Sequence, residues 1–318
     1  MEISAGAGPV TASDVSSHSA GAIKEELTSL DQLRRFATSG YLFALLDATD
    51  QILVPHRAKQ LGPAKAVSLF TGTANEWHWA VAPYLFHVDS DLLDWIAEKL
   101  WKEPWGIFAM SNATMEELRV HFKKFLMVQL PEGKQWLFRY YDPRILQVYL
   151  PTCEPWELQK FFGPVRAFAT ADNDEKKLMT LQEPTLAPQP QSTDPGTGVW
   201  WKIRPEQREA FKQTALENFI SRVVVHVNKF FPEECEALGT EGTRATVAYC
   251  AKRAAHYGIT SGTDISRYVD IAFAFGRDFD TAPGFSWARC VLLDNQLTAE
   301  SKIAKLFGIV AEIAERET

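Results

Sequence analysis

The first half of the chain alternates between short apolar runs and amphipathic segments. Residues 41–47 form a continuous apolar run that ends at a polar residue, which is typical of a buried central strand. Residues 78–88 predict a second strand, with a break or a sheet edge at Pro83, because proline cannot donate to a strand ladder. The same pattern predicts further strands at residues 106–110, 135–140, 165–170 and 177–181.

Helices are predicted between these strands, and residues suited to helix capping stand at their ends. Apolar positions in residues 91–101 fall on one stripe, which predicts an amphipathic helix capped by Ser90 or Asp91. Thr114 and Glu117 have the spacing of a capping box, in which each side chain accepts from the other residue's main-chain amide. A helix is therefore expected to begin just after Thr114.

Two more helices are predicted before residue 165. Asp142 is expected to cap a helix whose first residue is Pro143, where the missing proline amide is not needed. A short helix over residues 155–162 is expected to stop at Gly163 and Pro164. Strands that alternate with helices predict an α/β (α+β) lobe, in which a mixed sheet is flanked by helices.

A segment rich in proline and glycine divides the chain. Residues 183–198 contain four prolines and two glycines, which disfavour regular structure. We therefore predict a disordered segment over residues 1–28, an α/β domain over 29–182, a linker over 183–198 and a helical lobe over 199–318.

The last third of the chain shows helical periodicity throughout. Pro205 is suited to the first turn of a helix, and the Phe231-Pro232 pair is expected to end that helix. Gly258 and Gly276 are typical helix terminators. Together these signals predict an all-α lobe with helices over 205–230, 243–257, 263–275, 287–293 and 299–316.

Composition narrows the possible partners and compartments. The net charge of −7 and the pI near 5.6 are unlike those of nucleic-acid-binding domains, which carry basic patches. The N-terminus lacks the basic and apolar regions of a secretory signal, and no run of 18 apolar residues predicts a transmembrane helix. The four cysteines have no metal-site spacing and are expected to be reduced thiols. We expect a cytoplasmic protein without nucleic-acid or membrane partners.

Aromatic residues are numerous, with ten Trp and twenty Phe. Large aromatic side chains fill cores, and they also anchor protein–protein interfaces. The pattern alone therefore leaves both a large aromatic core and an exposed binding surface open.

Motifs for catalysis are absent or weak. The sequence has no GxSxG, no P-loop, no GxGxxG and no HExxH. His56, His78 and His87 could converge on a metal, and Cys153 could pair with His121 as a nucleophile, but no spacing supports either. We therefore predict no enzyme, no catalytic residue and no cofactor or metal.

The densest polar cluster lies at residues 139–144. A structural interpretation has Asp142 capping a helix while an arginine ties the turn to a carboxylate such as Asp47. An alternative is that Arg139 or Arg144 faces an acidic group of a partner.

This cluster also carries a resemblance to a known family. Residues 137–144, Leu-Phe-Arg-Tyr-Tyr-Asp-Pro-Arg, are followed by Phe-Phe-Gly-Pro-Val at 161–165. The two motifs resemble those of type VI secretion effector adaptors, whose defining module was catalogued as a domain of unknown function. Residues 41–47, 105–111 and 118–128 are similar in the same order, and segments at 256–260, 270–280 and 287–289 resemble a helical extension of that family.

The resemblance implies an adaptor, or effector chaperone, that binds a cognate secreted effector and promotes its loading onto the VgrG or PAAR spike. Alternatives are an immunity-type protein that neutralises a toxin, and a metal-dependent hydrolase. The candidate partner-binding residues are Trp77, Trp79, Tyr84, Arg139, Tyr141, Arg144, Trp156 and Phe162. The candidate structural motif residues are Asp47, Asp142, Pro143, Gly163 and Pro164.

Overall fold

The structure is a computed structural model that describes residues 24–49, 51–73, 78–101, 104–171, 178–182 and 201–317. The chain divides into two compact units, residues 1–211 and 212–318. The described part of the first unit is a sheet structure flanked by helices, and that of the second is helical, so the predicted fold class is confirmed. None of the helices in these ranges combines the length and apolar character needed to cross a membrane.

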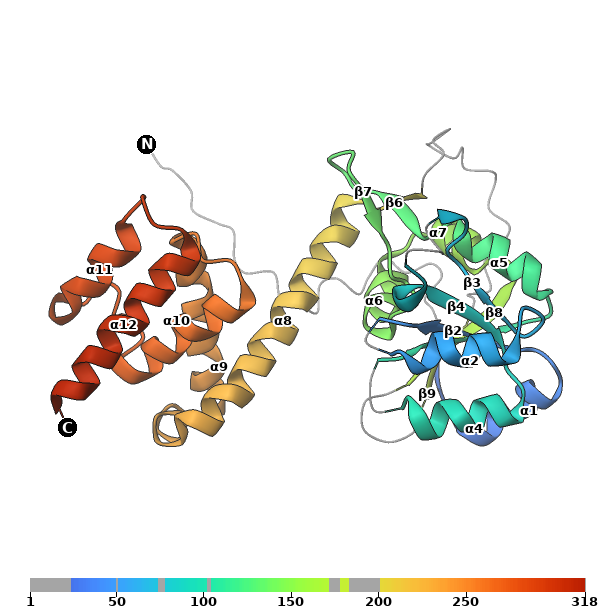
Figure 1. Ribbon diagram of the computed structural model, residues 1–318, viewed down its shortest axis with the longest axis horizontal. Coiled ribbons are helices and arrows are strands. Elements are labelled where there is room, and N and C mark those ends of the chain that lie inside the picture. The colour runs from blue at the N-terminus through green and yellow to red at the C-terminus, as the bar shows by residue number, and fades with distance from the viewer. Residues whose placement is uncertain are drawn as a thin grey trace, which may run out of the picture. The chain divides into compact units, whose positions relative to one another are not determined.

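Seven strands of the described chain form the main sheet of the first unit (Figure 1). Their spatial order is β1 (Lys24–Thr28), β9 (Leu178–Gln182), β8 (Val165–Ala171), β5 (Gly106–Ser111), β2 (Leu42–Asp47), β4 (Pro83–His87) and β3 (Ala66–Ser68). Every neighbouring pair in this sheet is antiparallel. All residues of the central strands β2 and β5 are buried, which explains their continuous apolar sequences.

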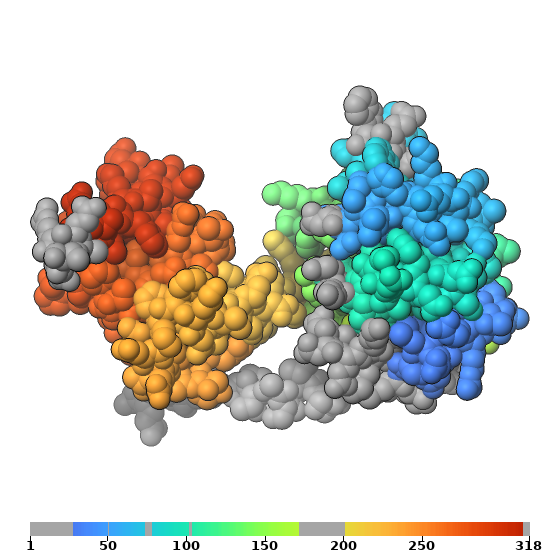
Figure 2. Space-filling view, turned by 60° about the horizontal axis from the view of Figure 1, so that its bottom comes forward, coloured from blue at the N-terminus to red at the C-terminus, as the bar shows by residue number. Residues whose placement is uncertain are grey.

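Helices cover both faces of the main sheet. Alternate residues of β2 point to opposite faces, so Phe43 and Leu45 join one core while Ala44 and Leu46 join the other. The Ala44 face is covered by α1 (Leu30–Thr38), α2 (Leu53–Leu61) and α4 (Ser90–Lys99), whose surfaces run from blue to teal in Figure 2. The Phe43 face is covered by α5 (Met115–Lys123), α6 (Pro143–Tyr149) and α7 (Pro155–Phe162).

The predicted caps are found at the starts of two of these helices, α5 and α6. Thr114 and Glu117 form both bonds of a capping box at α5. Asp142 caps α6, and Pro143 is its first residue, as predicted. At α4 the predicted caps Ser90 and Asp91 are wrong: the cap is Asp89, whose carboxylate accepts from the Leu92 amide at 2.9 Å.

A second, three-stranded sheet sets the boundary of the first unit. It consists of β10 (Trp201–Lys202), β6 (Met127–Gln129) and β7 (Gln135–Leu137). β10 is parallel to β6, and the buried Ile203 belongs to the core of the first unit. The predicted helical lobe therefore begins too early at residue 199, because residues 201–211 pack with the first unit. The predicted linker over 183–198 lies outside the described residues.

The second unit is built from helices around one core. Ile220, Val227, Val247, Tyr268 and Leu306 are among its buried residues. The helices are α8 (Pro205–Phe230), which begins in the first unit, α9 (Pro232–His256), α10 (Gly262–Phe275), α11 (Ser286–Leu293) and α12 (Ala299–Glu317), with a 3-10 turn η3 (Pro283–Phe285).

Two predicted boundaries need correction. Lys24–Thr28 were placed in the disordered segment, but they form β1, because pairing with the distant β9 provides main-chain hydrogen bonds that local composition does not reveal. The remainder of that segment, residues 1–23, lies outside the described residues. The helix predicted to begin at residue 243 begins at Pro232, and Gly239 interrupts it with a φ of 68°.

Candidate functional site

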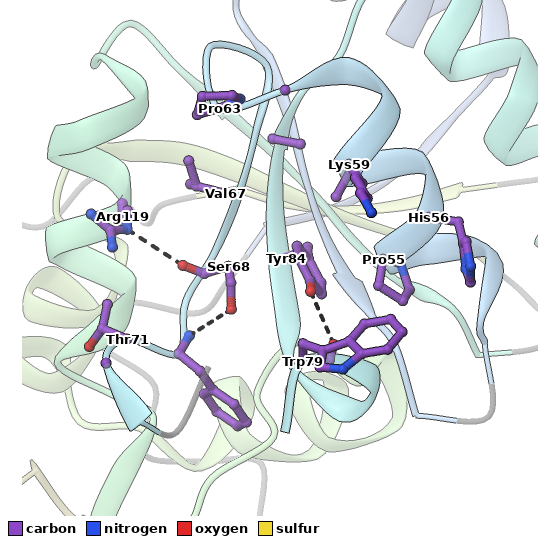
Figure 3. A pocket seen from close by; sticks show the side chains of 15 residues that line it. Pro55, His56, Lys59, Pro63, Val67, Ser68, Thr71, Trp79, Tyr84 and Arg119 are labelled. Atoms are coloured by element: carbon purple, nitrogen blue, oxygen red, sulfur yellow. Dashed lines mark hydrogen bonds between the residues drawn. The ribbon is translucent and has the colours of Figure 1, made fainter. Parts of the chain in front are cut away.

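A pocket opens beside β3, the short strand at one edge of the main sheet. It encloses about 700 Å³, a size typical of ligand and peptide sites. Its lining comes from α2, from β3 and the turn before it, from β4, and from α5 (Figure 3). We call it the β3-edge pocket. Lining residues used below are His56, Lys59, Val67, Ser68, Trp79, Tyr84 and Arg119.

Trp79 and Tyr84, two predicted partner-binding residues, come together in this pocket. Trp79 lies in η1 (Trp79–Val81), a single 3-10 turn that leads into Pro83, the first residue of β4. The buried Tyr84 hydroxyl donates to the Trp79 carbonyl at 3.0 Å (Figure 3). Burial also raises the pKa of Tyr84, so its hydroxyl remains a donor at neutral pH. This bond fixes the turn while the indole stays 44% exposed.

The charged groups of the β3-edge pocket are basic. Lys59 projects from α2 and has no ion-pair or hydrogen-bond partner among the described residues. The Arg119 guanidinium, on α5, reaches the Ser68 carbonyl at 3.5 Å and Glu116 at 3.3 Å, both long contacts. None of the described lining residues is an aspartate or glutamate. The pocket therefore favours negative charge within a chain of net charge −7.

The polar cluster at residues 139–144 ties the fold together, as the structural interpretation predicted. Arg139 pairs with Asp47, which is buried at the end of β2 and also accepts from the Thr49 amide at 2.9 Å. Asp142 accepts from the amide of Arg144 at 2.9 Å and from its guanidinium at 2.6 and 3.0 Å. Both arginines therefore compensate acidic groups that the fold buries.

Two other predicted partner-binding residues belong to the core. Tyr141 is 1% exposed and Phe162 is fully buried, so neither ring is presented to a partner in this structure. They pack in the core between the sheet and helices α5 to α7. Their residue types fit an interface as well as a core, and only burial distinguishes the two. Trp77 lies outside the described residues.

Gly163 and Pro164 form a tight turn after α7. Gly163 has a φ of 51°, and a Cβ atom there would lie 2.4 Å from the His121 ring. The Pro164 carbonyl accepts from the Ser111 hydroxyl at 2.6 Å, which links the turn to β5. His121 is buried and contacts the Phe161 carbonyl at 2.8 Å through Nε2, and burial lowers its pKa. A neutral imidazole therefore donates to that carbonyl.

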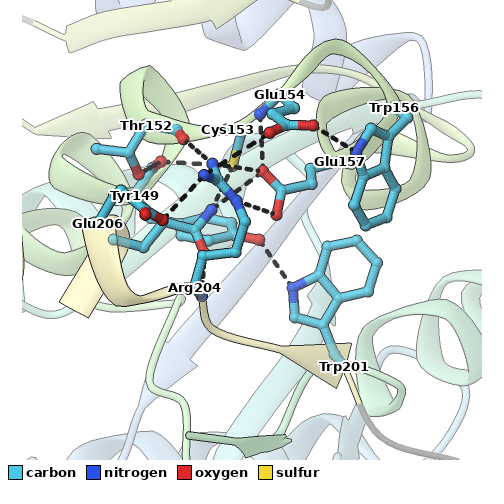
Figure 4. Close-up of polar contacts among 10 residues, drawn as sticks. Tyr149, Thr152, Cys153, Glu154, Trp156, Glu157, Trp201, Arg204 and Glu206 are labelled. Carbon is cyan, nitrogen blue, oxygen red and sulfur yellow. Dashed lines mark hydrogen bonds and ion pairs between the residues drawn. The ribbon is translucent and has the colours of Figure 1, made fainter. Parts of the chain in front are cut away.

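Sequence reasoning missed a buried ion pair between Glu157 and Arg204. Glu157 on α7 is 1% exposed, and the Arg204 guanidinium meets both of its oxygens at 3.1 Å (Figure 4). Arg204 also donates to the Thr152 carbonyl at 2.6 Å, and Gln207 donates to Glu157 at 3.1 Å. We call these four residues the Glu157–Arg204 cluster. The one signal in the sequence is Gln207, three residues after Arg204, because glutamine there can cap the start of a helix.

Trp156, another predicted partner-binding residue, lies beside this cluster. Its indole nitrogen donates to Glu154 at 2.9 Å, and its ring lies 5.8 Å from that of Trp201. Trp201 in turn donates to the Tyr149 hydroxyl at 2.8 Å (Figure 4). The half-buried Trp156 therefore helps to hold β10 against α7, far along the chain from Trp79.

The weak catalytic alternatives gain no support from these positions. Burial and the Glu157 carboxylate raise the pKa of the Cys153 thiol, which keeps it protonated and a poor nucleophile. His121, its proposed base, is bonded to the Phe161 carbonyl. Within the described ranges, no three His, Cys, Asp or Glu side chains are placed to hold a metal ion.

In the second unit, two segments that resemble the family's helical extension meet. Asp280 is buried, and it accepts from the Tyr257 hydroxyl and from Arg253 Nε, both at 2.8 Å. Arg253 and Asp280 reinforce each other electrostatically, which raises the pKa of Arg253. The Tyr257–Asp280 bond therefore joins the segment at 256–260 to the segment at 270–280.

Comparison with protein families gives one match. Residues 42–160 match the model described as Domain of unknown function (DUF4123). The matched range begins at β2 and ends in α7, so it contains the β3-edge pocket and Glu157 but not Arg204. No curated protein and no solved structure matches the chain.

Proposed function

We propose that the chain is an adaptor that binds a cognate type VI secretion effector in the cytoplasm and promotes its loading onto the VgrG or PAAR spike. The observation that carries this proposal is the DUF4123 match over residues 42–160. DUF4123 is a family associated with type VI effector adaptors, and the same residues carry the resemblance seen in the sequence.

The chemistry of the first unit supports a role in binding. In the Glu157–Arg204 cluster, the arginine forms an ion pair with the glutamate, and Arg139 forms a separate ion pair with Asp47. The charges of both pairs are therefore already compensated within the fold. The β3-edge pocket instead presents an exposed indole and a lysine that has no partner among the described residues. Exposed aromatic and basic side chains around a concave surface are typical of sites for protein segments.

The test is co-purification and delivery. The full chain is co-expressed with the effector and the spike protein encoded beside it, and with an unrelated effector as the control. We expect a stable complex with the cognate effector and none with the unrelated effector. Deletion of the gene is expected to abolish delivery of the effector while the spike protein is still secreted. A failure to bind either neighbouring protein, together with normal delivery, would overturn the proposal.

Fragment mapping separates an adaptor from an immunity-type protein. An adaptor is expected to bind an effector fragment that lacks the toxic domain, and to leave toxicity unchanged. Binding confined to the toxic domain, with protection of cells that express it, would support the immunity function instead.

A further inference from the structure

The outer edge of β3 offers main-chain groups to a partner. His87 donates to the Lys65 carbonyl and Leu69 donates to the Pro83 carbonyl, both at 2.9 Å, so odd-numbered residues of this segment bond to β4. In an antiparallel ladder the intervening residues point their main-chain groups the other way. Ala66 and Ser68 therefore direct theirs toward the β3-edge pocket.

Two of these four outward groups are already engaged. The Ala66 amide donates to the Gly62 carbonyl at 3.0 Å, and the Ser68 carbonyl accepts the long contact from Arg119. The Ala66 carbonyl and the Ser68 amide have no hydrogen-bond partner among the residues that the structure describes. They form an acceptor and a donor two residues apart on the open edge of the sheet.

This pair matches an added strand that is parallel to β3. In a parallel ladder, one residue donates its amide to a carbonyl and accepts, at its own carbonyl, from the amide two residues further along. A single residue opposite Val67 can therefore satisfy both Ala66 and Ser68. In an antiparallel ladder, a residue of the added strand would bond both to the amide and to the carbonyl of the same β3 residue. The Ala66 amide and the Ser68 carbonyl are already bonded, so an antiparallel strand would form only one of the two bonds at Ala66 and only one at Ser68.

The space beside β3 can hold such a strand between two helices. Ala66 packs into the core that α2 covers, and Val67 packs against the core that α5 covers. Residues of both helices line the pocket, with Lys59 on one side and Arg119 on the other (Figure 3). An added strand would extend the sheet between these helices, as peptides do in β-augmentation.

The charges select the side chains of that strand. Lys59 and Arg119 line the pocket, and no carboxylate belongs to its described lining. Trp79 offers a flat apolar surface to a neighbouring side chain. An extended segment that alternates acidic and apolar residues complements both features.

We propose that the β3-edge pocket binds an extended, acidic segment of the effector as a strand parallel to β3. This inference rests on the proposed adaptor function and assigns it a docking site. The full-length chain is titrated with synthetic 12-residue peptides that tile the cognate effector, and affinities are measured by calorimetry. One acidic peptide is expected to bind, and the Ser68 amide is expected to exchange hydrogen more slowly in its presence.

Matched variants locate the binding. Trp79→Ala is expected to weaken the peptide at least about tenfold, whereas Trp136→Ala, at a tryptophan of equal exposure on β7, leaves affinity unchanged. Lys59→Glu is expected to weaken it about fivefold, and more at low salt. Lys134→Glu makes the same change of charge outside the pocket and serves as its control. Equal effects of pocket and control variants would overturn the site.

Crosslinking decides the direction of the strand. A photoreactive residue at the carboxyl end of the peptide is expected to label Thr71 or Gly72, which follow β3, and an antiparallel strand would label Gly62 or Pro63. If the intact effector binds all variants equally and no peptide binds, the docking site is wrong and the adaptor function stands. If the effector itself does not bind, the adaptor function fails. A dimer of this chain that Trp79→Ala dissociates would identify a second copy as the occupant and overturn the proposal.

Discussion

Arg204 and Arg119 place the same side chain in two different settings of the first unit. Arg204 contacts both oxygens of the buried Glu157 and a main-chain carbonyl, within 3.1 Å. Arg119 makes long contacts with an exposed glutamate and with a carbonyl at the sheet edge. The charge of Arg204 is compensated by a buried carboxylate, so it cannot readily bind another group. The charge of Arg119 is only weakly compensated by an exposed carboxylate, so it can interact with a further negative group. The comparison indicates that burial of the counter-charge, more than the arginine itself, separates a structural site from a binding site.

The largest expected effect on stability comes from removing Arg204, the cation that pairs with the buried Glu157. Arg204→Ala leaves Glu157 buried without its cation, which is expected to lower the free energy of unfolding of the first unit by about 3 kcal/mol. The measurement is chemical denaturation followed by tryptophan fluorescence. Arg208→Ala is the control, because its pair with Glu132 is exposed and contributes less than about 1 kcal/mol. Equal losses in the two variants would show that the Glu157–Arg204 cluster stabilises the fold no more than an exposed ion pair does.

A slightly smaller effect is expected at the turn after α7. Gly163→Ala places a Cβ atom against His121 at a positive φ, and we expect a loss of about 2 kcal/mol. Gly284→Ala is the control, because the space around Gly284 is open and its φ is not positive. Thermal unfolding of both variants compares them. An unchanged midpoint for Gly163→Ala would show that the turn and His121 readily shift.

The pH dependence of stability tests the contribution of the buried His121, which packs beside Gly163. Burial lowers the pKa of His121, so below pH 6.5 the unfolded chain binds a proton that the folded chain resists. Stability is therefore expected to fall as the pH drops from 7.5 to 5.5, because the unfolded chain takes up a proton at this histidine before the folded chain does. His121→Gln keeps a donor and does not titrate, so the slope should flatten in that variant. A slope that persists unchanged would assign the effect to other groups.

The smallest expected effect on stability comes from a substitution in the β3-edge pocket. Lys59→Ala removes an exposed side chain without a partner among the described residues, so the free energy of unfolding should change by less than about 0.5 kcal/mol. Chemical denaturation checks this value against that of Arg204→Ala. A loss above 1 kcal/mol would mean that Lys59 supports the fold and that the two sites differ less than their geometry indicates.

Local chemistry made part of this fold predictable. The capping box of Thr114 and Glu117 and the cap at Asp142 depend on residues within three positions of each other, and the structure contains both. The buried runs of β2 and β5 were equally visible, because central strands are apolar on both faces. The pairing of Asp47 with an arginine of residues 139–144 was also foreseen, since a buried carboxylate at a strand end needs a cation.

What sequence reasoning missed depends on distant pairings. β3 has only three residues, too few for a periodic signal, and its importance comes from its position at the sheet edge. The Glu157–Arg204 pair joins residues 47 positions apart, on opposite sides of the predicted linker. Of the candidate partner-binding residues, Trp79 and Tyr84 share the β3-edge pocket, whereas Tyr141 and Phe162 are core residues of similar chemical character.

The pairing of β10 with β6 changes the meaning of the proline-rich segment. β9 ends at Gln182 and β10 begins at Trp201, and both strands belong to the first unit. The predicted linker range therefore falls, in the sequence, between two strands of the same unit, and the boundary between the two units lies further on, after Phe211 in α8. A single proteolytic cut between Gln182 and Trp201 would leave two fragments held together by β10, Ile203 and the Glu157–Arg204 cluster. The covalent connection between β9 and β10 is accordingly not needed to hold β10 on the first unit.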